Sequence, residues 1–360
     1  MSPVTAVAKL AYIPDGFRHT NVNYLVEYDP KAVIAQEGDL FVAQISNFDA
    51  GDPTHLNHIH VQRGKRYVSP GDLLPLILCY RRSIMELSST TEPYYLNASD
   101  QVYLLGGDGY AGSYQCVRSD YGRPVSAKIL GAIINPATVK QSRVGEFGPA
   151  HFPGSEITHR PVVVAVLGVR MDCGKSTTII QLTKTLRRSG HTVVAGKVSG
   201  FGCFYETKDL NPNFSVDFTD FGLPSTCGVD VQQIIKAAEW VLATLESQNP
   251  QIIFLEFGGD LIGPYRVMEI LQHIKDHIDF TIFVTFDLCG LKGGITQLHS
   301  MDCKVDLVTG PLVNTSLGVD LVKEWFYMPA ESNQSEMTRA TAAIERLIRT
   351  CRGAPEVLFP

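Results

Sequence analysis

From residue 161 onward, runs of consecutive apolar residues alternate with stretches in which apolar residues recur every three or four positions. The runs predict buried strands, and the periodic stretches predict helices with one apolar face. The predicted strands span 162–167, 192–198, 251–257, 280–286 and 305–309, and the predicted helices span 175–188, 230–246, 265–276 and 335–351. This alternation is typical of an α/β fold, a mostly parallel sheet with helices on both faces.

The earlier part of the chain has a different pattern. Short apolar segments separated by glycine-containing turns occur at 40–45, 58–61, 74–78 and 101–105. Short strands at such spacing predict a small, β-rich barrel or sandwich. Residues 137–160 are rich in Gly, Pro, Ser and His and predict a linker. We therefore expect two domains, a smaller β-rich domain over 1–150 and the α/β domain over 160–360.

Composition narrows the classes of protein to consider. The net charge of −6 at pH 7 disfavours a surface that binds nucleic acid. No apolar run approaches the roughly 20 residues of a membrane span, and residues 1–5 lack the features of a signal peptide. The eight cysteines show no paired spacing, which favours reduced thiols. We expect a cytoplasmic protein.

The strand over 162–167 leads into a turn bounded by Gly168 and Gly174, and a helix then begins with Lys175 and Ser176. In such a turn the backbone N–H groups and the helix N-terminus bind phosphate oxygens, the lysine adds a positive charge, and the hydroxyl can ligate Mg²⁺. The predicted nucleotide-binding residues are Gly168, Asp172, Cys173, Gly174, Lys175, Ser176 and Thr177. Five residues separate the two glycines, one more than in the usual loop, and a chance surface turn is the alternative.

Polar residues also follow the other predicted strands. They are Lys197 and Ser199, then Glu256 and Asp260 with Gly258 between them, and finally Asn314. Because the carboxyl ends of parallel strands meet at one edge, where ligands bind, we expect these residues to share a site. The long segment 201–228 adds Asp217 and Asp220, which are candidates for ligating Mg²⁺ or for acting as a base. Ser199, Asp217, Gly258 and Asp260 are the predicted substrate contacts.

Three stretches carry a family resemblance: the long phosphate loop, Lys197-Val198-Ser199-Gly200, and Glu256-Phe257-Gly258-Gly259. Over about 161–315 the chain resembles the dethiobiotin synthetase, CTP synthase and cobyric acid synthase group of P-loop enzymes. The resemblance implies a P-loop NTPase domain that uses ATP and Mg²⁺. The chain differs from the family at Arg170, where dethiobiotin synthetase has an aspartate, and it has no recognisable glutaminase domain.

The resemblance also implies roles for individual residues. Lys175 and Ser176 would hold the β- and γ-phosphates and Mg²⁺, with Glu256 as a direct or indirect Mg²⁺ ligand. Lys197 would face the acceptor and the transferred phosphoryl group, and Asn314 would hydrogen-bond adenine. Lys175, Lys197, Asp220 and Glu256 are the expected catalytic residues, and Ser176, Glu256 and Asp220 the expected metal ligands. A structural Lys197–Glu256 ion pair and a turn role for Asn314 are the alternatives.

The resulting functional hypothesis is an ATP- and Mg²⁺-dependent enzyme that phosphorylates or activates a small metabolite bearing a carboxylate or an amine. We expect a small-molecule substrate, no nucleic-acid or membrane partner, and a homo-oligomer, most simply a dimer. The main alternative is a nucleotide-switch NTPase or metallochaperone-like GTPase acting on a protein. No Asn-Lys-x-Asp guanine signature is visible in the sequence. A polynucleotide kinase is a third reading, which the acidic composition disfavours.

Three further clusters admit two interpretations each. His55, His58 and His60 are either metal ligands or part of a solvent-facing hairpin. Four cysteines expected on rim loops either come together or stay apart; they are Cys173, Cys203, Cys227 and Cys289. Segment 201–228 is either a substrate loop or a solvated connection with Ser225 and Thr226 as helix caps.

Overall fold

The computed structural model describes most of the 360-residue chain. The described residues are 5–48, 58–61, 64–83, 87–89, 95–118, 122–138, 140–149, 151–154, 159–202 and 213–351. The chain divides into two compact units. The first comprises Met1–Ala150 together with Phe201–Cys203 and Thr219–Gly228, and the second comprises His151–Gly200, Phe204–Phe218 and Val229–Pro360. Two short segments from the later half of the sequence therefore belong to the first unit.

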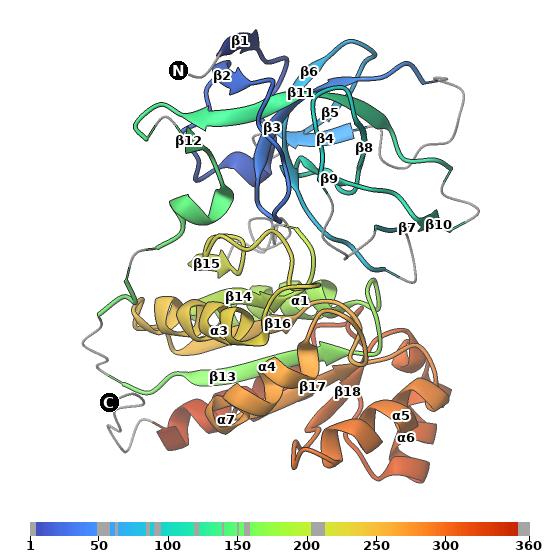
Figure 1. Cartoon of the computed structure of the whole chain (residues 1–360). Coiled ribbons are helices and arrows are strands. Elements are labelled where there is room, and N and C mark those ends of the chain that lie inside the picture. Colours follow the sequence, from blue (N-terminus) through green and yellow to red (C-terminus); the bar gives the residue numbers. More distant parts are fainter. Residues whose placement is uncertain are drawn as a thin grey trace. The chain divides into compact units, whose positions relative to one another are not determined.

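The first unit is built on a barrel (Figure 1). The strands of its main sheet are β1 (Ala6–Lys9), β2 (Leu25–Asp29), β3 (Leu40–Ile45), β6 (Leu73–Leu78), β8 (Gln101–Leu104), β9 (Tyr110–Gly112), β11 (Ser126–Asn135) and β12 (Lys140–Gln141). Strand β11 pairs with both β3 and β8, so the strands β11, β3, β6, β9 and β8 close on themselves. The predicted β-rich domain is confirmed, and of the two forms that the sequence left open, barrel or sandwich, it is the barrel.

The long strand β11 pairs with β3 and β8 and also with β2 and β12, and its pairing is irregular at a glycine. The β11–β3 register shifts between Ile129 and Gly131. A Cβ atom at Gly131 would lie 2.4 Å from the Asp29 carbonyl oxygen, so only glycine allows β2 to approach here. The barrel interior is filled by alternating apolar side chains, among them Phe41, Leu74 and Val102.

Smaller elements complete the first unit. They are the hairpin β4 (His58–Val61) and β5 (Gly64–Tyr67), the pair β7 (Leu87–Ser88) and β10 (Cys116–Val117), and the short helices η1 (Asp15–Phe17) and η2 (Val144–Phe147). Strand β12 and helix η2 fall within the predicted linker 137–160, and Val144 packs in the core. The linker prediction is therefore wrong for these residues, because buried apolar contacts fix them.

The second unit contains a six-stranded parallel sheet (Figure 1). Its strands are β13 (Val162–Gly168), β14 (Val193–Ser199), β15 (Phe214–Asp217), β16 (Ile252–Phe257), β17 (Phe280–Val284) and β18 (Leu307–Thr309), in the order β15-β14-β16-β13-β17-β18. The helical elements are α1 (Lys175–Arg188), α3 (Val231–Glu246), α4 (Val267–Ile274), η3 (Lys275–His277), α5 (Leu288–His299), η4 (Pro311–Val313), α6 (Ser316–Phe326) and α7 (Thr338–Cys351). The predicted α/β class is confirmed.

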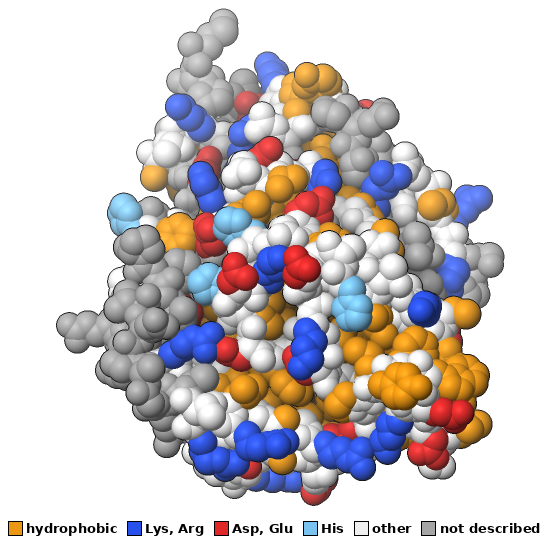
Figure 2. Space-filling model, turned by 90° about the horizontal axis from the view of Figure 1, so that it is seen from below, with side chains coloured by type: hydrophobic (Ala, Val, Ile, Leu, Met, Phe, Trp, Pro, Cys, Tyr) orange, Lys and Arg blue, Asp and Glu red, His pale blue; other side chains and the backbone are white. Residues whose placement is uncertain are grey.

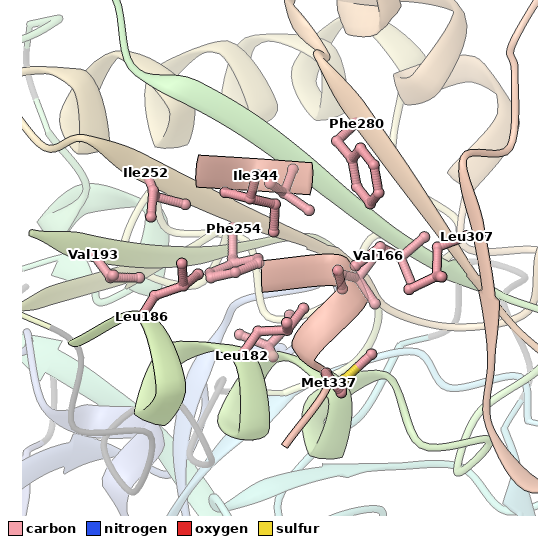
Figure 3. Close-up of a cluster of buried hydrophobic side chains, with 14 of the residues drawn as sticks. Val166, Leu182, Leu186, Val193, Ile252, Phe254, Phe280, Leu307, Met337 and Ile344 are labelled. Atoms are coloured by element: carbon pink, nitrogen blue, oxygen red, sulfur yellow. The ribbon is translucent and has the colours of Figure 1, made fainter. Parts of the chain in front are cut away.

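Helices cover both faces of this sheet. Val166 and Phe254 point toward Leu182 of α1 and Ile344 of α7, in the cluster drawn in Figure 3. On the opposite face, α3 packs against β14, where a Cβ atom at Gly196 would lie 2.8 Å from Leu245. Strand β13 lies between β16 and β17, so the turn that follows it opens near the middle of the sheet.

The surface of the second unit keeps some large apolar side chains in contact with solvent. Leu317 and Trp325 of α6, and Tyr327 directly after it, are more than half exposed. In the space-filling view, hydrophobic side chains gather toward the lower right of the face shown (Figure 2). No helix in the described part of the chain combines the length and apolar character that a membrane crossing requires.

Candidate functional site

The turn between β13 and α1 depends on the glycine at each end. Gly174 has φ of 104°, in the left-handed region that glycine enters without cost. A Cβ atom at Gly168 would lie 2.4 Å from Cys173 Sγ and 3.1 Å from the Val284 carbonyl oxygen. The turn therefore folds tightly over its own start, and Cys173 is buried beneath it.

Lys175 is the first residue of α1, and its side chain is enclosed by the turn. Its Nζ donates hydrogen bonds to the carbonyl oxygens of Arg170 (2.8 Å) and Gly259 (3.1 Å). The residue is only 5% exposed. An ammonium group held by neutral carbonyls at a helix N-terminus can exchange them for phosphate oxygens, which bind it more strongly.

The turn is tied to the end of β16 by a carboxylate. Asp260 Oδ1 accepts a hydrogen bond from Met171 N at 2.9 Å, and Asp260 is buried. Gly259, whose carbonyl accepts from Lys175, has φ of 88° and packs on Tyr265. Asp260 therefore orients the turn, and its predicted contact with a substrate stays a prediction.

Ser176 and Glu256 form the part of the site suited to Mg²⁺. Ser176 Oγ donates to Glu256 Oε2 at 2.9 Å, and Glu256 is 3% exposed at the end of β16. A hydroxyl oxygen and a carboxylate are ligands that Mg²⁺ accepts alongside water and phosphate oxygens. The described residues contain no cluster of three or more His, Cys, Asp or Glu suited to a metal.

Lys197 lies in register between two carboxylates. On β14 it is the partner of Asp217 on β15 and of Glu256 on β16, so all three side chains leave the same face of the sheet. Asp217 and Glu256 are both buried. A Cβ atom at Gly258 would lie 2.6 Å from Lys197 Cε, so glycine at 258 makes room for the lysine chain. The structure thus brings together the predicted residues Lys197, Asp217, Glu256 and Gly258.

Ser199, another predicted substrate contact, is fully buried. Its Oγ donates to the Gly258 carbonyl oxygen at 2.9 Å. This bond joins the ends of β14 and β16 beside Lys197. Ser199 therefore fixes the geometry around Lys197, and its role toward a substrate stays a prediction.

Asn333 was missed by the sequence analysis. Its Nδ2 donates to the Gly174 carbonyl oxygen (3.2 Å) and to Thr178 Oγ1 (3.1 Å), and the residue is 3% exposed. Thr178 Oγ1 in turn donates to the same Gly174 carbonyl at 2.8 Å. Asn333 comes from the segment before α7, about 155 residues away in sequence, and no local motif marks it.

Asn314 lies next to this segment. It follows η4, is exposed, and its Oδ1 accepts from Ser332 Oγ at 2.7 Å. Ser332 precedes Asn333, which holds Gly174, so Asn314 is linked to the phosphate loop through two neighbouring residues. A base-reading role for Asn314 stays a prediction.

Asp220 belongs to the first unit. Its Oδ1 lies 2.6 Å from Arg18 Nη2, and the same guanidinium donates to Thr219 Oγ1 at 2.8 Å. The structure therefore places Asp220 in an ion pair at the start of segment Thr219–Gly228, and its predicted role as metal ligand and catalytic group stays a prediction. Asp230, whose side chain accepts from Gln232 N, caps α3, so the alternative in which Ser225 and Thr226 cap it is wrong.

The structure describes only part of the histidine and cysteine clusters, and in the described part of the chain no group of three or more His, Cys, Asp or Glu is suited to a metal. His60 Nδ1 pairs with Asp108 Oδ1 at 2.9 Å on the described hairpin, and His55 lies outside the described residues. Cys203 also lies outside them. Cys173 belongs to the second unit and Cys227 to the first. Cys289 was expected on a rim loop but lies in α5 and is exposed, because the glycine-rich stretch after it is helical.

Comparison with known proteins identifies partial structural similarity only. No family model matches the chain, and no curated protein does. Among solved structures, the signal recognition particle receptor FtsY from Elizabethkingia anophelis matches at 19% identity and a TM-score of 0.36, covering 49% of this chain and 60% of that one. A DUF1611 family protein from Anabaena variabilis matches at 13% identity and a TM-score of 0.39, covering 57% and 62%.

A LAO/AO transport system kinase matches to a similar extent, at 13% identity and a TM-score of 0.37, covering 54% of this chain and 62% of that one. The chain thus spans about three fifths of the length of the first FtsY structure. These matches give no support to the narrower resemblance to the dethiobiotin synthetase group.

Proposed function

We propose that the chain binds a Mg²⁺-nucleoside triphosphate at residues 168–177 and uses it to phosphorylate or activate a small acceptor. The observation that carries this proposal is the enclosed ammonium group of Lys175, together with the hydrogen bond from the next residue, Ser176, to Glu256. A positive charge, a helix N-terminus and a hydroxyl–carboxylate pair stand together at one end of a buried strand. Phosphoryl transfer needs mainly such positioning and charge neutralisation.

The residues of the chain would divide the work as follows. The loop N–H groups and Lys175 bind the β- and γ-phosphates, and Ser176 with Glu256 holds Mg²⁺, which supplies charge stabilisation during transfer. Lys197, on strand β14 next to β16, would contact the transferred phosphoryl group. Asp217, in register with Lys197 on β15, is the carboxylate that would take a proton from an acceptor amine or hydroxyl.

The finer proposal is that the nucleotide is ATP. Asn314 lies in the loop after β18, at the same edge of the sheet as the phosphate loop, and an amide side chain can pair with the adenine edge. No Asn-Lys-x-Asp signature for guanine is visible in the sequence. A direct comparison of ATP and GTP affinities tests this choice.

A second candidate function is a nucleotide switch acting on a protein partner. The observation that favours it is chain continuity: β14 ends at Ser199 and β15 at Asp217, and within two residues each enters a segment of the first unit. In that unit Phe201 packs against Tyr110, and the Arg81 guanidinium lies 4.6 Å from the Phe201 ring centroid. The chain therefore connects the ends of these two strands directly to segments of the first unit, so a nucleotide-dependent change in the strand ends would act on those segments.

Turnover in the presence of acceptors separates the two candidates. The enzyme reading predicts that phosphate or diphosphate release with Mg²⁺-ATP rises when a pool of carboxylate- and amine-bearing metabolites is added. The switch reading predicts slow hydrolysis that no metabolite stimulates, with tight binding and exchange of GTP and GDP. Absence of any nucleotide binding by the full chain would overturn both.

A further inference from the structure

Arg170 stands on the phosphate loop, five residues before Lys175, and its side chain has a defined position without a carboxylate partner. The guanidinium carbon lies 4.1 Å from the centroid of the Phe286 ring. No described Asp or Glu lies within ion-pair distance of it. Arginine is stabilised over an aromatic face, and there it keeps its N–H donors at the edge available to a ligand.

The backbone around Arg170 is fixed on three successive residues. Val169 N donates to the Val284 carbonyl oxygen at 3.1 Å, and the Arg170 carbonyl accepts from Lys175 Nζ at 2.8 Å. Met171 N donates to Asp260 Oδ1 at 2.9 Å. The backbone of Arg170 is therefore hydrogen-bonded directly to the ammonium group that would hold the terminal phosphates. The flanking hydrogen bonds restrict the movement of this backbone.

The nearest acid in sequence to Phe286 is already used. Asp287 Oδ1 accepts from Gly290 N at 2.7 Å and caps α5. A helix cap of this kind is a local structural task, and it leaves the cation on the neighbouring aromatic ring uncompensated. An arginine that is partly buried, stacked and uncompensated beside a phosphate loop is poised to bind an oxyanion.

We infer that Arg170 binds the terminal phosphate of the nucleotide and stabilises its charge during transfer. This inference rests on the proposed function, since it assigns a residue to the same nucleotide. Lys175 and the loop N–H groups contact the γ-phosphate and also the β-phosphate, which a diphosphate carries too. Arg170 adds a cation that only a triphosphate uses, so it makes the site selective for the triphosphate.

The test compares a fluorescent non-hydrolysable triphosphate with the matching diphosphate, both with Mg²⁺, on the full chain. Arg170→Ala is expected to weaken triphosphate binding about tenfold or more while diphosphate binding stays within about twofold. Arg170→Lys keeps the charge but loses the planar guanidinium group, and its triphosphate affinity is expected to lie between those of the unaltered chain and Arg170→Ala. Arg188→Ala, at the opposite and exposed end of α1, is the matched control and is expected to change neither.

Equal losses for both nucleotides, or no loss for either, would overturn the inference. Unchanged thermal midpoints of the Arg170 variants show that the fold is intact, and Arg170→Lys serves if Arg170→Ala does not fold. Lys175→Ala separates this failure from that of the proposed function. If Lys175→Ala abolishes binding while Arg170→Ala leaves the triphosphate preference unchanged, only the role of Arg170 is wrong. If the unaltered chain binds neither nucleotide, the proposed function itself is wrong.

Discussion

Ser176 Oγ lies 2.9 Å from Glu256 Oε2, which joins the first turn of α1 to the end of β16 across 80 residues of sequence. Glu256 is buried, and so is Lys175, the neighbour of Ser176. Burying a carboxylate is costly unless it is paired and hydrogen-bonded. The arrangement places a hydroxyl and a carboxylate together at the point where a phosphate-bound cation would sit, and it makes the magnesium requirement testable.

Replacement of Glu256 by Gln should uncouple nucleotide binding from Mg²⁺. The amide keeps the size of the side chain but removes the charge that would hold the cation or orient its hydroxyl ligand. We expect the Mg²⁺ concentration needed for half-maximal nucleotide binding to rise about tenfold or more. Titration of Mg²⁺ against nucleotide fluorescence measures it, with Ser189→Ala at the exposed C-cap of α1 as the control. An unchanged Mg²⁺ dependence would remove Glu256 from the metal site.

Replacement of Gly174 by Ala should damage the phosphate loop specifically. Gly174 has φ of 104°, and an added Cβ atom would lie 2.9 Å from Asn333 Nδ2. Gly190, beyond the other end of α1, has φ of 87° but nothing within 4 Å of an added Cβ atom. Both substitutions strain the backbone, at a cost of about 1 kcal/mol or more in unfolding free energy.

Only Gly174→Ala should also weaken nucleotide binding, because only there must Asn333 and the loop shift. Thermal unfolding and nucleotide titration of both variants provide the comparison. The interpretation of the loop is wrong if the two variants lose stability alike and both bind nucleotide normally.

Glu246 predicts a pH dependence of stability. Burial raises the pKa of Glu246 from 4.5 to about 7, and the nearby Arg160 lowers it only in part. Between these values the folded chain keeps a proton that the unfolded chain releases, so stability should fall as pH rises through that window and level off above it. One such proton contributes at most about 1.4 kcal/mol per pH unit.

Glu246→Gln should flatten this slope between about pH 5 and 7. Chemical denaturation at several pH values measures it, with the exposed Glu336→Gln as the control. If Glu246→Gln and Glu336→Gln leave the same slope as the unaltered chain, Glu246 does not carry the dependence.

The sequence alone predicts much of the second unit, because its strands are apolar and strongly β-branched. Helix α1 begins and ends where its periodicity predicts, from Lys175 to Arg188. Helix α5 was missed since its glycines at 290, 293 and 294 read as a loop. A Cβ atom at Gly294 would lie 2.0 Å from the Phe283 ring, so close packing on the sheet explains the glycine there. Strand β15 was missed because it has only four residues.

The candidate site also contains residues that the sequence predicts and residues that it does not. Lys175 and Ser176 could be found because they follow an apolar strand, and Lys197 and Glu256 because they lie near the carboxyl ends of two others. Parallel strands bring these ends together. Asn333 could not be found, since its contacts with Gly174 arise only from the packing of the segment before α7. The ion pair of Asp220 with Arg18 joins residues 202 apart, and no local pattern predicts which of the four acids in segment 201–228 enters it.

Nucleotide binding by Lys175→Ala tests the central claim most directly. The full chain and this variant are compared by thermal unfolding with Mg²⁺ and either ATP or GTP, because a ligand that binds the folded form raises the midpoint. We predict that one nucleotide stabilises the unaltered chain and that Lys175→Ala unfolds at a similar temperature without this gain. Equal stabilisation of both proteins, or none for the unaltered chain, would contradict the assignment of residues 168–177 as a nucleotide-binding loop.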